Sequence, residues 1–268
     1  MLKPPYIVFI FVILLICNHS FAAPKALKVA IVDAFFCRHL KTKNIIPKDM
    51  TGENDLYGKK CDESRKYHGN KVAREFLKSF KASHPLELYL YKVFTKEGNQ
   101  DTKALKLALL DIKKNEIDAT IMAIGFFNYK DLPQDLPTLT LVAAGASGNG
   151  VNGDEMLWPQ MLENPNLVLF AHYFPSQASI KTNPKSSKNI FEGHIDPSLM
   201  NLNKVNFFIP SPPNPTDLSG SSLATAVGSG MLLRACFPLK NLSDCLKNHT
   251  HSLTILNSKL SKNFSTFN

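Results

Sequence analysis

Three residues of types that can act together in acyl transfer stand in separate parts of the chain: Asp33, His68 and Ser222. Ser222 lies where a polar Gly/Ser turn becomes an apolar helix, at the positive end of the helix dipole, near unpaired backbone N–H groups. That position suits a nucleophile whose reaction builds negative charge on a neighbouring oxygen. The histidine would take the serine proton, and the aspartate would stabilise the imidazolium. A simpler interpretation, in which Ser222 only caps a core helix, stays open at this point.

The elements that must position these residues can be predicted from apolar patterns. Lys28–Val32 is a β-branched run typical of a buried parallel strand, and it delivers Asp33 to the carboxyl end of that strand, where ligands collect. His68 begins an amphipathic helix, and Asp101 is suited to capping a second helix that runs through Lys114. Further strands are expected at 87–94, 117–124, 138–144, 167–171 and 205–209. This alternation predicts an α/β fold in three layers, with a mostly parallel central sheet and helices on both faces.

The first 22 residues are expected to be a cleaved signal peptide. A positive start precedes the apolar run Tyr6–Ile16, and Ser20-Phe21-Ala22 has the small-x-small pattern of a cleavage site. The run is short for a bilayer span, so we expect no stable membrane insertion. Residues 23–268 are expected to form a single domain with a polar C-terminal tail at about 241–268. The mature chain is predicted to be secreted or periplasmic.

Removal of the signal peptide would leave four cysteines, Cys37, Cys61, Cys236 and Cys245. An even number in an exported chain favours disulfides, and their spacings do not resemble a zinc site. Four cysteines allow three connectivities. We expect Cys37–Cys61 and Cys236–Cys245, because each pair is closest in sequence.

The positive charge does not indicate a nucleic-acid partner. The net charge is +9, but the lysines are scattered through amphipathic segments, and no basic run is interleaved with aromatic residues. His249 and His251 stand in a polar stretch, where solvated histidines are more common than metal ligands. No cofactor is therefore expected, and the sequence does not identify a structural calcium site.

Three segments follow one another in the chain order aspartate, histidine, serine: Val29–Asp33, His68–Ala73 and Gly220–Ala224. They resemble the aspartate, histidine and serine segments of the subtilisin-like serine peptidases, in that family's chain order. Weaker matches follow in register at Ile121–Gly125, Ala143–Gly145 and Trp158-Pro159. The resemblance extends from about residue 27 to residue 233.

The resemblance implies a serine endopeptidase that hydrolyses protein or peptide substrates through an Asp33–His68–Ser222 triad and an acyl-enzyme. It also implies substrate-binding segments formed by Ala123, Ile124, Gly125, Ala144 and Gly145. These segments carry no charged side chain, so an apolar residue is expected before the scissile bond.

Departures from the family pattern bear on activity. Ala34 stands where the family usually has a hydroxyl residue after the aspartate, and Lys71 stands where it has a second histidine. Ala146 stands where an oxyanion-hole asparagine is expected. Asn149, between two glycines, is the expected replacement, with Ser147 as the less favoured donor.

Two further expectations follow from this comparison. The predicted signal peptide leaves no room for a long propeptide, so either the fold assembles unaided or a separate protein assists it; a folding helper or an inhibitor is the kind of partner expected. The altered surroundings of the triad keep a second function class open, a catalytically weak or inactive secreted binding or effector protein with the same fold.

Overall fold

The computed structural model describes residues 25–34, 36, 44–53, 67–81, 84–127, 131–145, 157–182, 189–195, 202–212, 218–237, 245, 248, 250–255 and 264–267. Within the strands at 176–182, 189–193, 250–255 and 264–267, only the backbone is described. The predicted signal peptide, the Cys37–Cys61 pair, and Ala146, Ser147 and Asn149 lie outside these residues.

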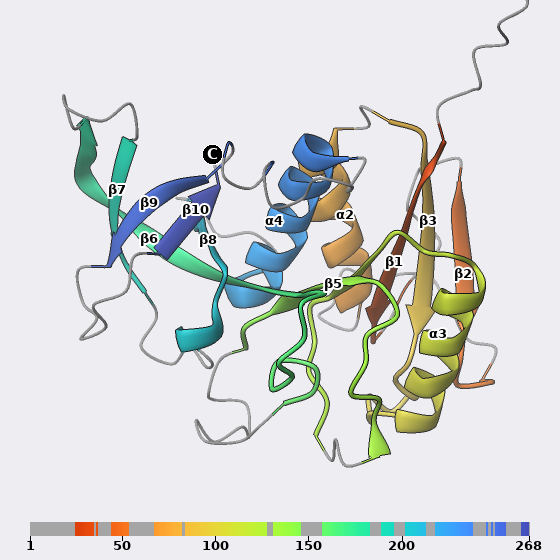
Figure 1. The fold of residues 1–268 in the computed structure, drawn as a ribbon. Coiled ribbons are helices and arrows are strands. Elements are labelled where there is room, and N and C mark those ends of the chain that lie inside the picture. Colours follow the sequence, from red (N-terminus) through yellow and green to blue (C-terminus); the bar gives the residue numbers. More distant parts are fainter. Residues whose placement is uncertain are drawn as a thin grey trace, which may run out of the picture.

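A parallel sheet forms the middle layer of the molecule (Figure 1). Seven strands pair side by side in parallel, in the order β2-β3-β1-β4-β5-β6-β8. Their bounds are β1 Leu27–Asp33, β2 Ile45–Asp49, β3 Leu86–Lys92, β4 Ala119–Met122, β5 Leu139–Ala143, β6 Leu167–Thr182 and β8 Phe207–Pro210. The predicted α/β class and mostly parallel sheet are confirmed.

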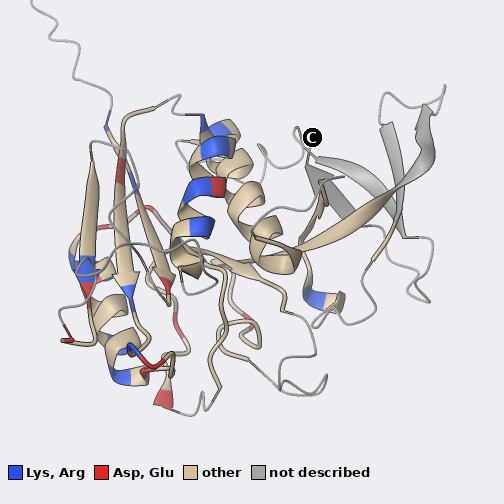
Figure 2. Cartoon of the chain, turned by 180° about the vertical axis from the view of Figure 1, so that it is seen from behind, with Lys and Arg blue, Asp and Glu red and all other residues tan. Residues whose placement is uncertain are grey.

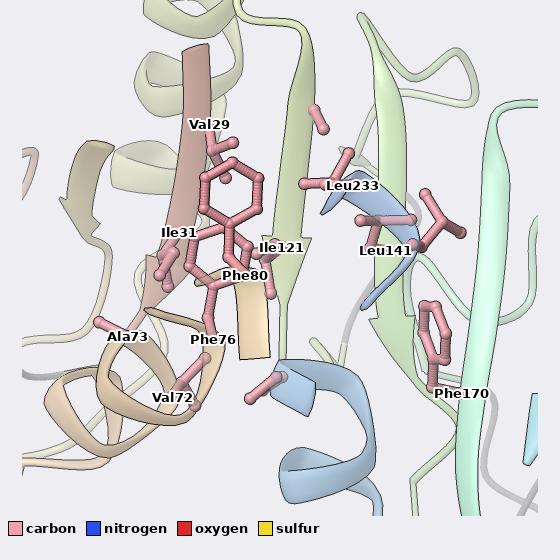
Figure 3. Close-up of a cluster of buried hydrophobic side chains, with 14 of the residues drawn as sticks. Val29, Ile31, Val72, Ala73, Phe76, Phe80, Ile121, Leu141, Phe170 and Leu233 are labelled. Atoms are coloured by element: carbon pink, nitrogen blue, oxygen red, sulfur yellow. The ribbon is translucent and has the colours of Figure 1, made fainter. Parts of the chain in front are cut away.

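Helices cover both faces of this sheet. Helices α2 (His68–Phe80) and α4 (Gly220–Cys236) pack on one face, and α3 (Thr102–Lys114) packs on the other. The strands alternate accordingly: Val29 and Ile31 face α2, while Ala30 and Val32 face α3. Each face of the sheet therefore has its own hydrophobic core. Figure 3 shows the core on the α2 side, in which Phe76 and Phe80 of α2 meet the side chains of β1 and β4.

The starts of the two amphipathic helices agree with the predictions. Asp101 is the N-cap of α3, and its side chain accepts a hydrogen bond from the N–H of Ala104 at 2.9 Å. Helix α2 begins at His68, although its N-cap residue Tyr67 makes no side-chain capping bond. The tertiary core of α2 therefore supplies the stability that its N-terminus lacks.

A buried charge lies beside Asp33 in the sheet. Lys92 is paired in register with Asp33 on one side and with Asp49 on the other. Its ammonium lies 2.7 Å from Glu53 Oε2, and its residue is only 1% exposed. This hydrogen bond, the largest influence, lowers the pKa of Glu53. The Lys92–Glu53 ion pair therefore holds the segment that follows the edge strand β2 against β3, the strand next to β1.

The second half of the chain closes a smaller ring of strands. β6 continues beyond the parallel sheet and pairs antiparallel with β7 (Asn189–His194). β7 pairs with β9 (Thr250–Ile255), β9 with β10 (Phe264–Phe267), β10 with β8, and β8 with β6. The stretch 241–268, expected as a polar tail, thus supplies two strands, and Figure 1 shows this ring apart from α3. The short 3₁₀ helix η2 (Leu202–Lys204) precedes β8.

Cys236 and Cys245 form a disulfide, as expected from their proximity in sequence. Cys236 is the last residue of α4. No described helix is long and apolar enough to cross a membrane.

Candidate active site

The carboxylate of Asp33 is fully buried at the end of β1. Its Oδ1 accepts a hydrogen bond from the N–H of Ala34 at 2.7 Å and lies 2.8 Å from Nδ1 of His68. Its Oδ2 is buried and has no hydrogen-bond partner in the described part of the chain. Ala34 has no hydroxyl, so its side chain offers no donor to this carboxylate.

His68 connects this buried carboxylate with the surface. Its side chain is 30% exposed, against 0% for Asp33. An ionised carboxylate can only accept hydrogen bonds, so Nδ1 carries the hydrogen towards Asp33 and the other ring nitrogen is left as a proton acceptor. This is the tautomer that a general base for a serine hydroxyl requires.

The pKa of His68 results from opposing influences. Burial is the largest and lowers the pKa, while the charge of Asp33 and its hydrogen bond both raise it. The ammonium of Lys71 lowers it. The net effect places the pKa of His68 above its ordinary value of 6.5.

Ser222 is the third residue of α4. The N-cap Ser219 is extended, and Gly220 has a left-handed φ of +64°, a conformation that suits glycine at the turn into the helix. Among the first residues of a helix, backbone N–H groups have no intrahelical acceptor, and the N–H of Ser222 is one of these. Ser222 is half-buried, whereas its neighbour Ser221 is only 8% exposed. The more accessible of the two hydroxyls is therefore that of Ser222.

The sheet brings Ser222 towards the Asp33–His68 pair. The Oγ of Ser222 donates to the carbonyl oxygen of Ala123 at 3.1 Å. β1 and β4 are adjacent and parallel, with Ile31 opposite Ile121; Asp33 ends β1, and Ala123 directly follows β4. Adjacent strands lie about 4.8 Å apart. The Asp33–His68 pair and the Ser222–Ala123 contact thus lie at the carboxyl ends of two adjacent strands.

The serine and the histidine are not hydrogen-bonded to each other in the described contacts. The hydroxyl of Ser222 is directed to Ala123, and the ring of His68 is held by Asp33. A rotation about the Cα–Cβ bond of Ser222 is the movement that would redirect its Oγ.

The predicted substrate-binding segments lie next to each other because β4 and β5 are paired, with Met122 opposite Val142. Ala123, Ile124 and Gly125 follow β4, and Ala144 and Gly145 follow β5. The carbonyl oxygen of Gly125 already accepts a hydrogen bond from Gln100 Nε2 at 2.8 Å.

Sequence reasoning missed Gln160, which links these two segments. Its Nε2 donates to the carbonyl oxygens of Ile124 at 3.2 Å and Ala143 at 2.9 Å. The residue follows Trp158-Pro159, whose peptide bond is cis. The resemblance of Trp158-Pro159 to a family turn was the only sequence signal near Gln160, and it did not indicate a contact with either strand end.

The described residues contain no cluster of three or more His, Cys, Asp or Glu side chains suited to a metal ion. The proposed oxyanion donors Asn149 and Ser147 follow β5 in the chain but lie outside the described residues.

Comparisons with family models and with curated proteins give no match. Among solved structures, the chain is similar to a lanthipeptide protease, with 16% sequence identity and a TM-score of 0.46. That similarity covers 78% of this chain and 72% of the protease.

Proposed function

We propose that this protein is an exported serine endopeptidase of the subtilisin-like type, which hydrolyses peptide bonds through Asp33, His68 and Ser222. The observation that carries the proposal is the 2.8 Å contact between the buried carboxylate of Asp33 and Nδ1 of His68, beside the helix start that presents Ser222. A buried carboxylate, an imidazole open to the surface and a half-buried hydroxyl have the burial that the three roles require.

In the proposed reaction, Ser222 Oγ attacks the substrate carbonyl carbon while its proton passes to the free ring nitrogen of His68. The negative charge of Asp33 stabilises the imidazolium. The proton then goes to the leaving amine, the C–N bond breaks, and an acyl-enzyme remains. Water, deprotonated by His68, attacks this ester; the C–O bond then breaks, the proton passes from His68 to Ser222 Oγ, and the carboxylic acid product leaves.

The oxyanion of each tetrahedral intermediate needs fixed donors. The unpaired N–H of Ser222 is proposed as one donor, because it lies beside the attacking oxygen. Asn149 is proposed as the other, with Ser147 as the alternative, on the strength of the glycine-flanked turn in the sequence.

The proposal is tested by a matched pair of serine variants. Ser222→Ala should abolish labelling by a fluorophosphonate probe and lower peptide hydrolysis by several orders of magnitude, with folding retained. Ser221→Ala changes the neighbouring buried hydroxyl and should keep both the labelling and most of the hydrolysis. Equal hydrolysis by Ser222→Ala and the parent protein would eliminate the peptidase.

A second candidate function is a binding or effector protein that uses the same edge of the sheet without turnover. The observations that favour it are the hydroxyl of Ser222 turned to Ala123 and the Oδ2 of Asp33, which has no hydrogen-bond partner among the described residues. In that case peptides would bind to the parent protein, while the fluorophosphonate probe would leave Ser222 unlabelled.

A further inference from the structure

Helix α3 presents two leucines to solvent. Leu107 is 45% exposed and Leu110 is 65% exposed. They are three residues apart, so their side chains are neighbours on the helix surface. The contact of α3 with the sheet is made by the residues on its other side, Ala104, Leu105, Ala108, Leu109 and Ile112. The two outer leucines are therefore available for contact with another surface.

Lysines flank this pair on the same outer face of α3 (Figure 2). The helix contains four exposed lysines, which are Lys103, Lys106, Lys113 and Lys114. Lys103 stands four residues before Leu107, and Lys114 stands four residues after Leu110. Residues spaced by three and four lie along one stripe of a helix, so this stripe contains a lysine, two leucines and a second lysine in turn.

The positive charge of this face is not neutralised by the acidic residue of α3. Asp111 is half-buried, and its Oδ2 accepts a hydrogen bond from the hydroxyl of Tyr91 at 2.8 Å and lies 3.4 Å from Nζ of Lys48. The ion pairs between described residues include none of the four lysines of α3. Lys103 also lies in the first turn, where a positive charge opposes the helix dipole. These lysines therefore do little to stabilise the helix that carries them.

We propose that this outer face, formed by the two leucines and the four lysines of α3, binds the surface of a membrane that contains anionic lipids. The helix lies parallel to the surface, the leucines contact the acyl chains just below the headgroups, and the lysine side chains extend to the phosphates. A cluster of four or more lysines on an amphipathic helix is typical of binding to anionic lipids. This is attachment to a membrane surface and needs no spanning helix.

The charge of the face decides between a membrane and a second copy of this chain. Two copies that met through α3 would bring eight lysines together around four leucines, and like charges at short range repel. A layer of lipid phosphates can instead contact all four lysines at once. The inference is independent of the proposed peptidase function.

Vesicle sedimentation tests the proposal. The mature protein is used, because the apolar run of the predicted signal peptide would itself bind lipid. At about 0.1 M salt, the protein should bind vesicles made of equal parts of phosphatidylglycerol and phosphatidylcholine, and should not bind vesicles of phosphatidylcholine alone. Leu107→Gln/Leu110→Gln should lower the partition coefficient about tenfold or more, because contact with the acyl chains is lost. Lys103→Gln/Lys106→Gln should lower it about fivefold for each lysine.

Two matched variants control for charge and position. Glutamine, leucine, lysine and arginine all favour helices, so α3 should stay folded in each variant, as circular dichroism would show. Lys103→Arg/Lys106→Arg keeps the charge and should keep the binding. Lys78→Gln/Lys81→Gln removes two exposed lysines at α2, on the other face of the sheet, and should retain most of the binding.

A tryptophan at the surface reports which face touches the lipid. Trp158 is the only tryptophan of the sequence and is fully buried, so an added tryptophan gives a separate signal. The fluorescence of Leu110→Trp should be quenched by anionic vesicles whose acyl chains are brominated. Phe174→Trp places the reporter at an exposed position of β6 and should not be quenched.

Four results would overturn the proposal. The first is the absence of binding to the anionic vesicles by the parent protein. The second is an equal loss of binding in the α2 and α3 lysine variants with no effect of the leucine variant, which would show only the attraction of a basic protein to anions. The third is self-association that Leu107→Gln/Leu110→Gln abolishes, without vesicle binding, which would assign the face to contact between copies. The fourth is binding to polyglutamate but not to vesicles, which would indicate an acidic protein partner.

Discussion

At the scale of single residues, the pKa of His68 can be altered by substitution of its charged neighbours. The ring must be neutral to accept a proton from Ser222, so kcat/KM should rise as the pH passes upward through the pKa of His68. Asp33 holds that pKa above 6.5, and Lys71 works against Asp33. The two neighbours can therefore be changed separately.

Lys71→Met should shift the acidic limb of the kcat/KM profile to higher pH. Removal of the ammonium removes an influence that lowers the pKa of His68, so more of the ring is protonated at any given pH. The profile is measured at constant, low ionic strength, because salt screens the effect.

Lys78→Met is the matched control on the same helix. The ammonium of Lys78 lies 2.9 Å from Glu75 Oε1, and Lys78 is not among the groups that shift the pKa of His68. Figure 2 shows several basic residues along α2. Lys78→Met removes one positive charge from this helix, as Lys71→Met does, so it also tests for an effect of the lost charge in general. A shift of equal size in both variants, or no shift in Lys71→Met, would contradict the account of His68.

At the scale of elements, the spacing between α2 and α4 sets the position of His68 relative to Ser222. The two helices approach closely at Gly230, where an added Cβ would lie 2.7 Å from the carbonyl oxygen of Phe76 and 2.7 Å from Cβ of Ser79. These contacts belong to the α2 backbone and the stem of a short side chain, which cannot rotate away. The helices themselves would have to separate.

Gly230→Ala should destabilise the fold by about 1–3 kcal/mol and lower kcat as well. Displacement of α2 as a unit would carry His68 away from Ser222, and small displacements of catalytic groups have large effects on rate. Urea unfolding gives the stability, and single-turnover hydrolysis of a peptide gives the rate of the chemical step.

Gly228→Ala provides the comparison within the same helix. Its Cβ would lie 2.5 Å from Cδ1 of Phe170, a residue of β6 and not of α2. This variant should lose comparable stability and retain a larger share of its single-turnover rate. If the two variants lose rate in the same proportion to stability, the spacing of α2 and α4 has no specific role.

The elements also show what could be predicted from the sequence. The amphipathic pattern and the Asp101 cap predicted α2 and α3, and apolar runs predicted β1, β4 and β5 to within a few residues. The edge strand β2 was missed because Pro47 and Lys48 interrupt its apolar pattern. The extension of β6 beyond residue 171 was missed because this part of the strand contains many polar residues. It pairs with β7, and its sequence lacks the apolar pattern by which core strands are predicted.

The sequence predicted the pairing of Asp33 with His68, which the structure contains, but not the other contacts of the candidate site. Local segments identified Asp33, His68 and Ser222, because each stands at the start or end of a recognisable element. Gln160 could not be found in this way, since its role depends on two strand ends that are far from it in sequence. The direction of the Ser222 hydroxyl is likewise a rotamer choice that no sequence pattern contains.

At the scale of the whole molecule, β6 joins the sheet that carries the site to the ring of β6, β7, β9, β10 and β8. The disulfide joins Cys236, the last residue of α4, to Cys245, which precedes the ring strand β9 in the chain. The helix that begins near Ser222 therefore ends at a covalent link to the C-terminal part of the chain.

Loss of this disulfide should lower the free energy of unfolding by about 2–3 kcal/mol, because it closes a short loop in the unfolded chain. Urea unfolding of a Cys236→Ser/Cys245→Ser double variant, compared with the oxidised parent, measures this effect. Non-reducing peptide mapping should recover Cys236 joined to Cys245. A free thiol at either position in the oxidised protein would contradict the link.

Closure of the ring of β6, β7, β9, β10 and β8 limits the strand edges at which copies of this protein could pair with one another. Of the strands that the structure describes, β2 alone has a neighbour on one side only. Open strand edges are templates for intermolecular pairing and fibril growth, and prolines and lysines at an edge oppose both. Pro47 is exposed in the middle of β2 and has no N–H to offer, and Lys48 follows it. The described sheet thus presents a single open border, and that border lacks a backbone donor at its centre.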